Sequence, residues 1–231
     1  MARRQIRTLT PTELARVQQG VLVRIVDDDA SLRDALRFVL ETEVWRVVDY
    51  RSAIDFFRGD APSVPGCVVM DVRMPGLTGI EAQAVMNERG FSLPVIFLTG
   101  HGDIDMAVKT MKDGADDFLS KPVTPERLLD AIEKAVKRDA RIRTESAALE
   151  QARAAFRRLS AREQEVATGV ARGLLNKQIA YELNISEKTV IAHRSSLCKK
   201  LGARTAADIT RMLMTIDPDA ITGAPAPADG E

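Results

Sequence analysis

Carboxylates at the ends of two short apolar runs are the residues of this sequence best suited to chemistry. Asp27, Asp28 and Asp29 follow the first run, and Asp71 follows a later one. Clustered carboxylates repel one another unless a cation neutralises them, and an oxygen-only ligand set selects a hard ion such as Mg²⁺. A carboxylate can also attack phosphorus and form an aspartyl phosphate. These residue types therefore predict a Mg²⁺ site that includes a carboxylate nucleophile.

Two further apolar runs end in groups that suit phosphoryl transfer. Thr99 would donate its hydroxyl to phosphoryl oxygens, and Lys121 would balance the charge of the transferring group. Each group alone has an ordinary alternative. A single acidic residue at a strand end is usually a solvated loop residue or a helix cap, which is our interpretation of Asp29, and a single lysine is usually a surface residue. The whole set at four run ends favours a functional site.

Short strands that alternate with helices would have to position these groups. Apolar runs of strand length lie at residues 21–26, 44–48, 67–70, 95–98 and 115–119. Between them, apolar residues recur at helical spacing over residues 32–40, 80–85, 106–111 and 128–136. This alternation predicts a parallel sheet with helices on both faces. Ligands of such sheets bind at the carboxyl ends of the strands, where the polar residues above would meet.

A long helix is predicted to follow the last strand. Residues 124–158 contain no glycine and no proline after Pro125, and they are rich in Ala, Glu, Arg and Leu, which are strong helix formers. We therefore expect the helix over 128–136 to continue into a helical linker, with a flexible charged linker as the alternative. Ile132, Val136 and Leu149 offer apolar positions for pairing with a second copy, but the heptad pattern is too broken for a coiled coil.

The pattern beyond Leu159 indicates helices only. The spacing of Ser160 and Glu163 is that of a capping box, Asn176 and Ser186 are expected to cap two further helices, and a last helix is expected over 205–214. A helix over about 177–183, a tight turn and a second helix after Ser186 have the geometry of a helix-turn-helix. The N-terminal part of such a second helix enters the DNA major groove.

Composition bounds the class of protein. The chain has 231 residues, of which 45% are hydrophobic and 29% charged, as expected for globular domains with apolar cores. No run of eighteen apolar residues occurs, so no membrane span is expected. Two distant cysteines, Cys67 and Cys198, argue against a disulfide framework or a zinc site and suit a reducing cytoplasm.

The net charge of zero hides an asymmetry between the two halves. Residues 21–138 carry 15 Lys or Arg against 20 Asp or Glu, whereas residues 156–213 carry 11 against 5. An acidic first module and a basic last module predict different partners, and a small basic module is a candidate for nucleic-acid binding. A helix bundle with a merely solvated basic face is the alternative.

The first module resembles the receiver domain of two-component systems. The segments that carry the resemblance are Ile25–Asp29, Met70–Gly76, Leu98–Asp103 and Phe118–Pro122. The resemblance implies a flavodoxin-like, five-stranded parallel sheet of order 2-1-3-4-5 with helices on both faces. It also implies a cis peptide bond between Lys121 and Pro122, where a proline makes the cis form accessible.

Matched residue by residue, the resemblance assigns roles to the polar set. Asp71, Thr99 and Lys121 would act in phosphoryl transfer, with Asp71 as the phosphoacceptor. The Mg²⁺ ligands would be Asp27, Asp28, Asp71 and the backbone carbonyl of Arg73. Thr99 and Phe118 would form the switch pair, although Phe118 can also be read as a core residue. The segment 99–103 resembles the FixJ-like branch.

The last module resembles the four-helix DNA-binding domain of the LuxR, NarL and FixJ family. The matching segments are residues 159–166, 173–180, 183–186 and 188–193. Ile191 departs from many relatives, in which a charged residue is common, so relatives' operator sequences are not expected to transfer. The implied DNA contacts are Asn176, Lys177, Lys188, Thr189 and Lys199, mainly to phosphates, and Ile191, Ala192, Arg194 and Ser195 on or beside the exposed stripe.

These interpretations give a domain plan. We expect an N-terminal extension over 1–20, a receiver domain over 21–138, a helical linker over 139–157, a LuxR-type helix-turn-helix domain over 158–214 and a disordered tail over 215–231.

The expected function is a phosphorylation-controlled transcriptional regulator in the cytoplasm. A cognate histidine kinase would phosphorylate Asp71, and the protein would form a homodimer on double-stranded promoter DNA, with RNA polymerase as a further candidate partner and no membrane contact. No enzymatic activity is expected beyond self-catalysed aspartyl phosphorylation and dephosphorylation. The alternatives are a phosphorelay adaptor whose C-terminal helices bind protein, and a phosphorylation-independent regulator with a vestigial receiver.

Overall fold

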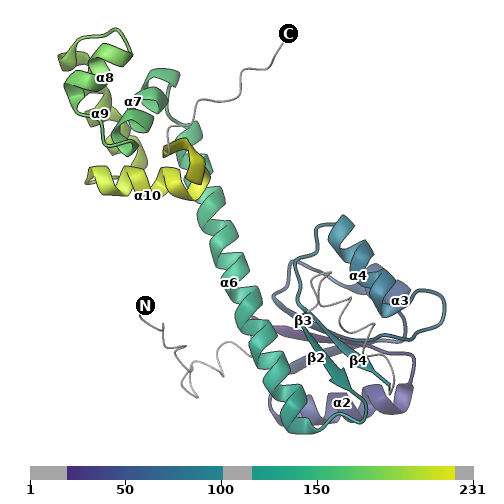
Figure 1. Cartoon of the computed structure of the whole chain (residues 1–231). Coiled ribbons are helices and arrows are strands. Elements are labelled where there is room, and N and C mark those ends of the chain that lie inside the picture. Colours follow the sequence, from purple (N-terminus) through teal and green to yellow (C-terminus); the bar gives the residue numbers. More distant parts are fainter. Residues whose placement is uncertain (1–19, 101–115, 222–231) are drawn as a thin grey trace, which may run out of the picture. The chain divides into compact units, whose positions relative to one another are not determined.

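The fold is built from two compact units whose boundary lies between Arg143 and Thr144, inside one long helix. A computed structural model describes residues 20–100 and 116–221 (Figure 1). The N-terminal extension up to residue 19, the helix predicted over 106–111 and the tail from residue 222 lie outside these residues. Within 20–100 and 116–221, no helix combines the length and hydropathy needed to cross a bilayer.

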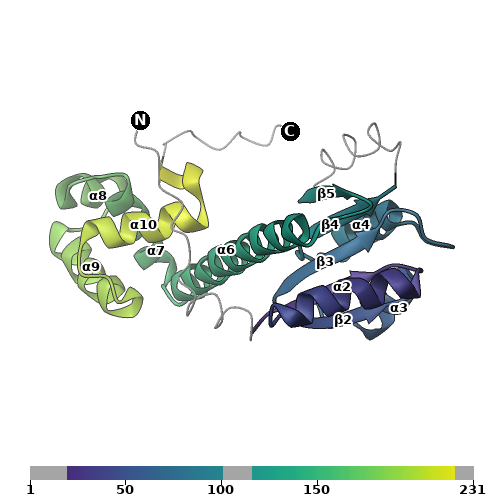
Figure 2. The ribbon, with the colours of Figure 1, turned by 90° about the horizontal axis from the view of Figure 1, so that it is seen from below.

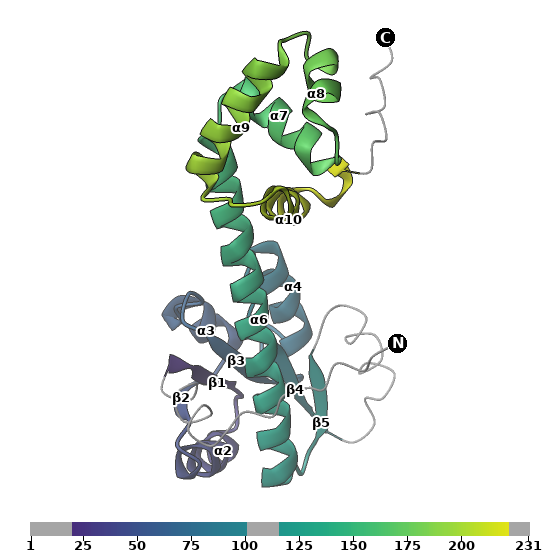
Figure 3. The ribbon, with the colours of Figure 1, turned by 90° about the vertical axis from the view of Figure 1, so that its left-hand side faces the viewer.

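The first unit contains the predicted parallel sheet. Its strand order is β2-β1-β3-β4-β5, all neighbouring strands are parallel, and Figure 3 shows them in this order from left to right. This confirms the expected order 2-1-3-4-5. The strands are β1 (Leu22–Val26), β2 (Arg46–Tyr50), β3 (Gly66–Asp71), β4 (Val95–Thr99) and β5 (Asp117–Ser120).

Helices cover both faces of this sheet, and each face has its own apolar core. Side chains alternate along a strand, so Val23 and Ile25 of β1 join the core beneath α2 and α6, while Val26 joins the core beneath α3 and α4. Burial on both faces explains why β1, β3 and β4 read as nearly continuous apolar runs. The helices of this unit are α2 (Ala30–Thr42), α3 (Ala53–Gly59), α4 (Gly79–Glu88) and the first part of α6 (Pro125–Arg157).

The second strand begins later than the sequence predicts. The apolar run at 44–48 suggested a strand, but β2 is Arg46–Tyr50. Val44 adopts a left-handed φ of 64° and is 69% exposed. Its N–H donates to the carbonyl of Glu41, and the Trp45 N–H donates to that of Leu40. Val44 therefore terminates α2 at a position that glycine usually occupies, and its side-chain type concealed the turn.

The long helix is continuous, as predicted. Figure 2 shows α6 as one unbroken helix over Pro125–Arg157. The buried Asp139 carboxylate accepts hydrogen bonds from the Gly66 N–H and the Arg143 side chain, each at 2.9 Å. Arg143 also donates to the carbonyls of Pro62 and Ser63 at 3.0 Å. These contacts hold α6 on the first unit as far as Arg143, beyond residue 138.

The second unit is a bundle of short helices, which confirms the predicted all-α module. Ser160 and Ser186 cap two of its helices as predicted, whereas Asn176 is the first residue of its helix and Leu175 occupies the cap position. Asn184 makes the tight turn with a φ of 51°. The helices are α7 (Ala161–Ala171), α8 (Asn176–Glu182), α9 (Glu187–Leu201) and α10 (Ala206–Ile216), followed by the 3₁₀ helix η1 (Pro218–Ile221).

The end of this bundle differs from the expectation of disorder from residue 215. Helix α10 runs to Ile216, and η1 then continues to Ile221. The buried α10 residues Ile209 and Leu213 join the core of the unit together with Val190 and Leu197 of α9. The ordered part of the unit therefore continues past residue 215, where the prolines and small residues of the sequence suggested that a tail begins.

Candidate functional site

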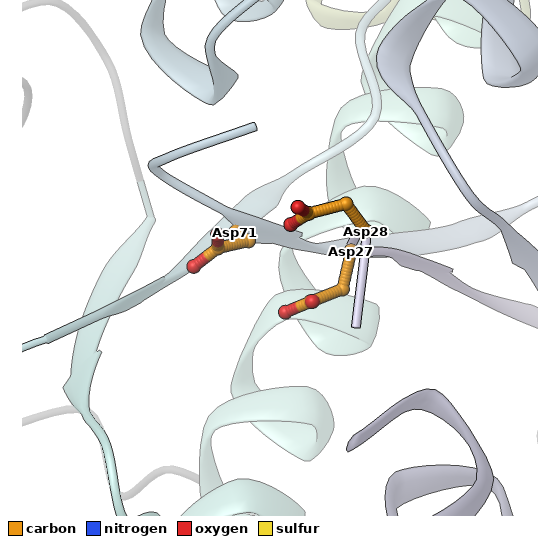
Figure 4. A group of neighbouring side chains, drawn as sticks. All are labelled: Asp27, Asp28 and Asp71. Atoms are coloured by element: carbon orange, nitrogen blue, oxygen red, sulfur yellow. The ribbon is translucent and has the colours of Figure 1, made fainter. Parts of the chain in front are cut away.

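Three carboxylates meet at the carboxyl end of the sheet. One oxygen each of Asp27, Asp28 and Asp71 lies within 4.8 Å of the others, and Figure 4 shows the Asp27 and Asp28 side chains extending toward Asp71. Strands β1 and β3 are neighbours in the sheet, which brings their ends together. Asp27 and Asp71 are buried and Asp28 is exposed. Asp28 is therefore the solvent-facing member of the cluster, and the other two carboxylates lie beneath the surface.

Lys121 joins two of these carboxylates. Its Nζ atom lies 2.8 Å from Asp71 Oδ1 and 2.9 Å from Asp27 Oδ2. The Lys121 N–H donates to the Thr99 carbonyl at 2.7 Å, which fixes the end of β5 against β4. The peptide bond to Pro122 is cis, as the resemblance implied. The lysine is therefore a positioned cation between two strand ends.

Burial and neighbouring charges shift the pKa values of Asp71 and Lys121. Burial raises the pKa of the Asp71 carboxyl, and the hydrogen bond and charge of Lys121 oppose that rise only in part. Burial lowers the pKa of Lys121, but its hydrogen bonds to Asp71 and Asp27 outweigh the effect and leave the pKa above its usual value. The ammonium therefore keeps its proton at neutral pH.

Backbone and arginine contacts fix the position of Asp27. Its Oδ1 atom accepts a hydrogen bond from the Asp29 N–H at 2.8 Å, and its carbonyl accepts one from Arg33 at 2.8 Å. The Asp29 side chain caps α2 by accepting hydrogen bonds from the N–H groups of Ser31 and Leu32. Asp29 is thus a helix cap, as interpreted from the sequence, and it is not part of the carboxylate cluster.

The other predicted receiver residues surround the cluster. The Arg73 N–H donates to the Asp71 carboxylate. Thr99 follows Leu98, the β4 partner of Asp71, and its hydroxyl donates to the Gly100 carbonyl at 3.2 Å. Phe118 in β5 is half-buried and packs against Phe97 with ring centroids 5.1 Å apart. Both interpretations of Phe118, as a core residue and as a movable aromatic, are compatible with this position.

Gly79 supports the site, and the sequence reasoning assigned it no role there. It is the first residue of α4, and its N–H donates to the Val72 carbonyl at 3.0 Å. A Cβ atom at this position would lie 2.3 Å from the Asp71 carbonyl oxygen. Only glycine lets α4 start this close to the Asp71 backbone. A glycine at the first helical position after the Asp71 loop was the available signal.

The second unit presents a helix-turn-helix with most of the predicted DNA-contact residues on its surface. In α9, Val190 and Leu197 are fully buried, which orients the helix. Two of the predicted contacts, Asn176 and Arg194, are half-buried rather than exposed, and Arg194 donates to Asn176 Oδ1 at 2.6 Å. That bond joins α8 to α9. The exposed predicted contacts are Lys177, Lys188, Thr189, Ile191, Ala192, Ser195 and Lys199.

Glu163 holds α9 against α7. The sequence predicted its capping box with Ser160 but not its contacts with α9. The nearly buried carboxylate accepts hydrogen bonds from Lys200 at 2.7 Å, Ser196 at 2.6 Å and the Ser160 N–H at 2.7 Å. The hydrogen bond from Lys200, followed by that from Ser196, lowers the pKa of Glu163 to about 2. The charge of Lys200 is therefore engaged inside the unit.

Comparison with known proteins agrees with both modules. Residues 23–133 match the family described as response regulator receiver domain, and residues 157–213 match the bacterial regulatory proteins of the luxR family. Nodulation protein W of Bradyrhizobium diazoefficiens is 42% identical over 195 residues, which cover 84% of this chain and 86% of that protein. The transcriptional regulatory protein FixJ of Azorhizobium caulinodans is 37% identical, covering 85% of this chain and 93% of FixJ.

The chain belongs to the FixJ-like response regulators. Among solved structures, response regulator StyR matches this response regulator with a TM-score of 0.76 at 40% identity, covering 84% of this chain and 98% of StyR. Full-length FixJ from B. japonicum matches with a TM-score of 0.52 at 36% identity, covering 84% and 96% of the two chains.

This response regulator is therefore a transcriptional regulator of a two-component system. Its receiver domain implies a histidine kinase as partner, and its LuxR-type domain implies DNA binding. The LuxR-type match decides against the protein-binding adaptor. Several relatives are transcriptional regulatory proteins, in keeping with a non-enzymatic function.

Proposed function

We propose that Asp71 is the phosphoacceptor of this response regulator and that its phosphorylation controls DNA binding through α9. The observation that carries the proposal is the Asp27, Asp28 and Asp71 cluster bridged by Lys121 in a chain that also holds a helix-turn-helix. A carboxylate oxygen of Asp71 bonds to phosphorus while the N–P bond of the kinase phosphohistidine breaks, and the electron pair stays on the imidazole. Lys121 then contacts the phosphoryl oxygens.

The donor set fits Mg²⁺. The cluster offers only carboxylate oxygens, the ligand type that this ion prefers. We infer that Asp27, Asp28, Asp71 and the carbonyl of Arg73 hold the ion, with Asp28 on the exposed side. When bound, Mg²⁺ supplies positive charge that balances the oxygens of the transferring group.

Thr99 and Phe118 form the proposed switch. The Thr99 hydroxyl, which donates to Gly100 in this structure, turns to a phosphoryl oxygen, and Phe118 moves further into the space beside Phe97. Phosphorylation then biases a two-state element, for which a few kcal/mol suffice. The reshaped face around β5 and α6 promotes a homodimer.

The homodimer binds two half-sites on double-stranded promoter DNA about one helical turn apart. Helix α9 enters the major groove, and RNA polymerase is a further candidate partner in the cytoplasm. The hydrogen bond between Asn176 and Arg194 holds the two helices of the motif while these residues contact DNA. The proposed phosphate contacts are Asn176, Lys177, Lys188, Thr189 and Lys199, and the proposed groove contacts are Ile191, Ala192, Arg194 and Ser195.

The domain boundaries are also part of the proposal. We assign residues 21–138 to the receiver, 139–157 to the linker and 158–214 to the DNA-binding domain. The Asp139–Arg143 contacts support a linker that leaves the receiver surface only after Arg143.

Labelling with acetyl phosphate and Mg²⁺ tests the proposal. Wild type should gain one phosphoryl group, Asp71→Asn should gain none, and Asp29→Asn should behave as wild type because asparagine also caps helices. Equal labelling of wild type and Asp71→Asn would contradict the assignment. Labelling at Asp71 without any change in DNA affinity would support the phosphorylation-independent regulator instead.

A further inference from the structure

The exposed stripe on the N-terminal half of α9 has an uncharged centre. Ile191 is 52% exposed, and Ala192 and Ser195 are exposed beside it. Lysines flank this centre, with Lys188 about one turn before Ile191 and Lys199 about one turn after Ser195. The central side chains therefore offer a branched aliphatic group, a methyl group and a single hydroxyl.

Neighbouring cations of α9 are engaged within the unit. The Arg194 guanidinium donates to Asn176 Oδ1 at 2.6 Å, and Lys200 pairs with Glu163 at 2.7 Å. This bond engages one terminal nitrogen of the guanidinium, whose two terminal nitrogens would together be needed for a bidentate contact to a guanine edge. The exposed side chains of Ile191, Ala192 and Ser195 themselves offer no cationic donor to guanine.

The edges of the bases decide what this stripe can recognise. Guanine presents two acceptors, cytosine a donor, adenine one of each, and thymine an acceptor and the C5 methyl group. The side chains of Ile191 and Ala192 contain no polar atom, so hydrogen bonding cannot give them a preference. The thymine methyl is the one group in the major groove that they complement.

We infer that Ile191, with Ala192 beside it, recognises the C5 methyl of a thymine in each half-site. The inference rests on the proposed function, in which α9 enters the major groove. Contact with the methyl removes apolar surface of both partners from water, and that gain is absent for the other three bases.

Deoxyuridine tests this inference, because it differs from thymidine only by the missing methyl. DNA sites are first selected from a random pool with the full-length phosphorylated protein, and each thymine of the selected site is then replaced singly by deoxyuridine. Burial of one methyl contributes about 0.8 kcal/mol, so a single replacement at the contacted thymine should weaken binding about fourfold. Ile191→Ala should bind the thymine and deoxyuridine sites equally, and Ile191→Val should fall between.

Ser195→Ala is the matched control, since it alters the same stripe without removing the aliphatic contact, and it should keep the wild-type ratio of affinities. If a site is selected but every deoxyuridine replacement affects wild type and Ile191→Ala alike, the inference is overturned and the proposed function stands. If no site is selected and binding to DNA shows no salt dependence, the proposed function fails and the inference falls with it.

Discussion

Gly79→Ala should displace the Asp71 backbone without changing the Asp71 carboxylate itself, because it adds one methyl group beside the phosphoacceptor. The added Cβ would lie 2.3 Å from the Asp71 carbonyl oxygen, and real Cβ atoms essentially never approach closer than 3.0 Å. The difference requires the Asp71 backbone or the start of α4 to move by at least about 0.7 Å. The Phe97 ring, at 3.1 Å from the same Cβ, is a second close contact that limits this movement.

Two effects follow from this displacement. Overpacking of a dense core costs about 1–3 kcal/mol of unfolding free energy. A misplacement of about 1 Å at a reacting group can cost about a hundredfold in rate, so we expect Asp71 phosphorylation by acetyl phosphate to slow by about that factor. The rate is read as the appearance of phosphoprotein with time, and urea unfolding reports whether the variant is folded.

Gly59→Ala is the matched control. It also adds a Cβ to a helical glycine of the first unit, but the nearest atom is Tyr50 Cε1 at 3.3 Å, far in the chain from Asp71. It should leave the phosphorylation rate unchanged. A folded Gly79→Ala protein that is phosphorylated at the wild-type rate would refute the argument that glycine at this position sets the Asp71 backbone.

Three further predictions concern stability and DNA binding. Arg24→Met should lower the unfolding free energy of the first unit by about 3–5 kcal/mol in urea, because it leaves the buried Asp60 carboxylate, 2.6 Å from Arg24, without its cation. Adding Asp60→Leu should restore part of the loss, and no restoration would argue against the charge as the cause. Because the pKa of Glu163 is lowered from 4.5 to about 2, its carboxylate stabilises the second unit fully above pH 4.5, and this stabilisation is lost as the pH falls toward 2. Glu163→Gln should flatten this part of the plot of unfolding free energy against pH, and an unchanged plot would contradict the assignment. Lys188→Ala should lower the slope of log affinity against log salt by about one, whereas Lys200→Ala, whose ammonium is held by Glu163, should change it less; equal changes would mean that both lysines contact phosphate.

The acidic site could be predicted from the sequence because topology alone brings its parts together. Asp27, Asp71, Thr99 and Lys121 each end an apolar run, and parallel strands place such ends at one edge of the sheet. The capping residues were visible for a similar reason, since the hydrogen bonds of Ser160 and Ser186 are local.

Contacts between distant segments could not be predicted in this way. Arg24 reads as an interruption of an apolar run, and its partner Asp60 is 36 residues away. Nothing local indicates that this arginine is fully buried. The position of Gly79 at a helix start could be read from the sequence, but the close approach of the Asp71 carbonyl could not. Arg194 was assigned to DNA from its position in the helix, and its bond to Asn176 depends on how α8 and α9 pack.

Chemical identification of the phosphorylated residue shows directly whether Asp71 is the phosphoacceptor. Borohydride reduces an aspartyl phosphate to homoserine, so the reduced, digested protein reveals the acceptor by mass spectrometry after incubation with acetyl phosphate and Mg²⁺. We expect homoserine at position 71 alone, next to the Lys121 ammonium that lies 2.8 Å from Asp71 Oδ1. Homoserine at position 27 or 28, or at none of the three, would contradict it.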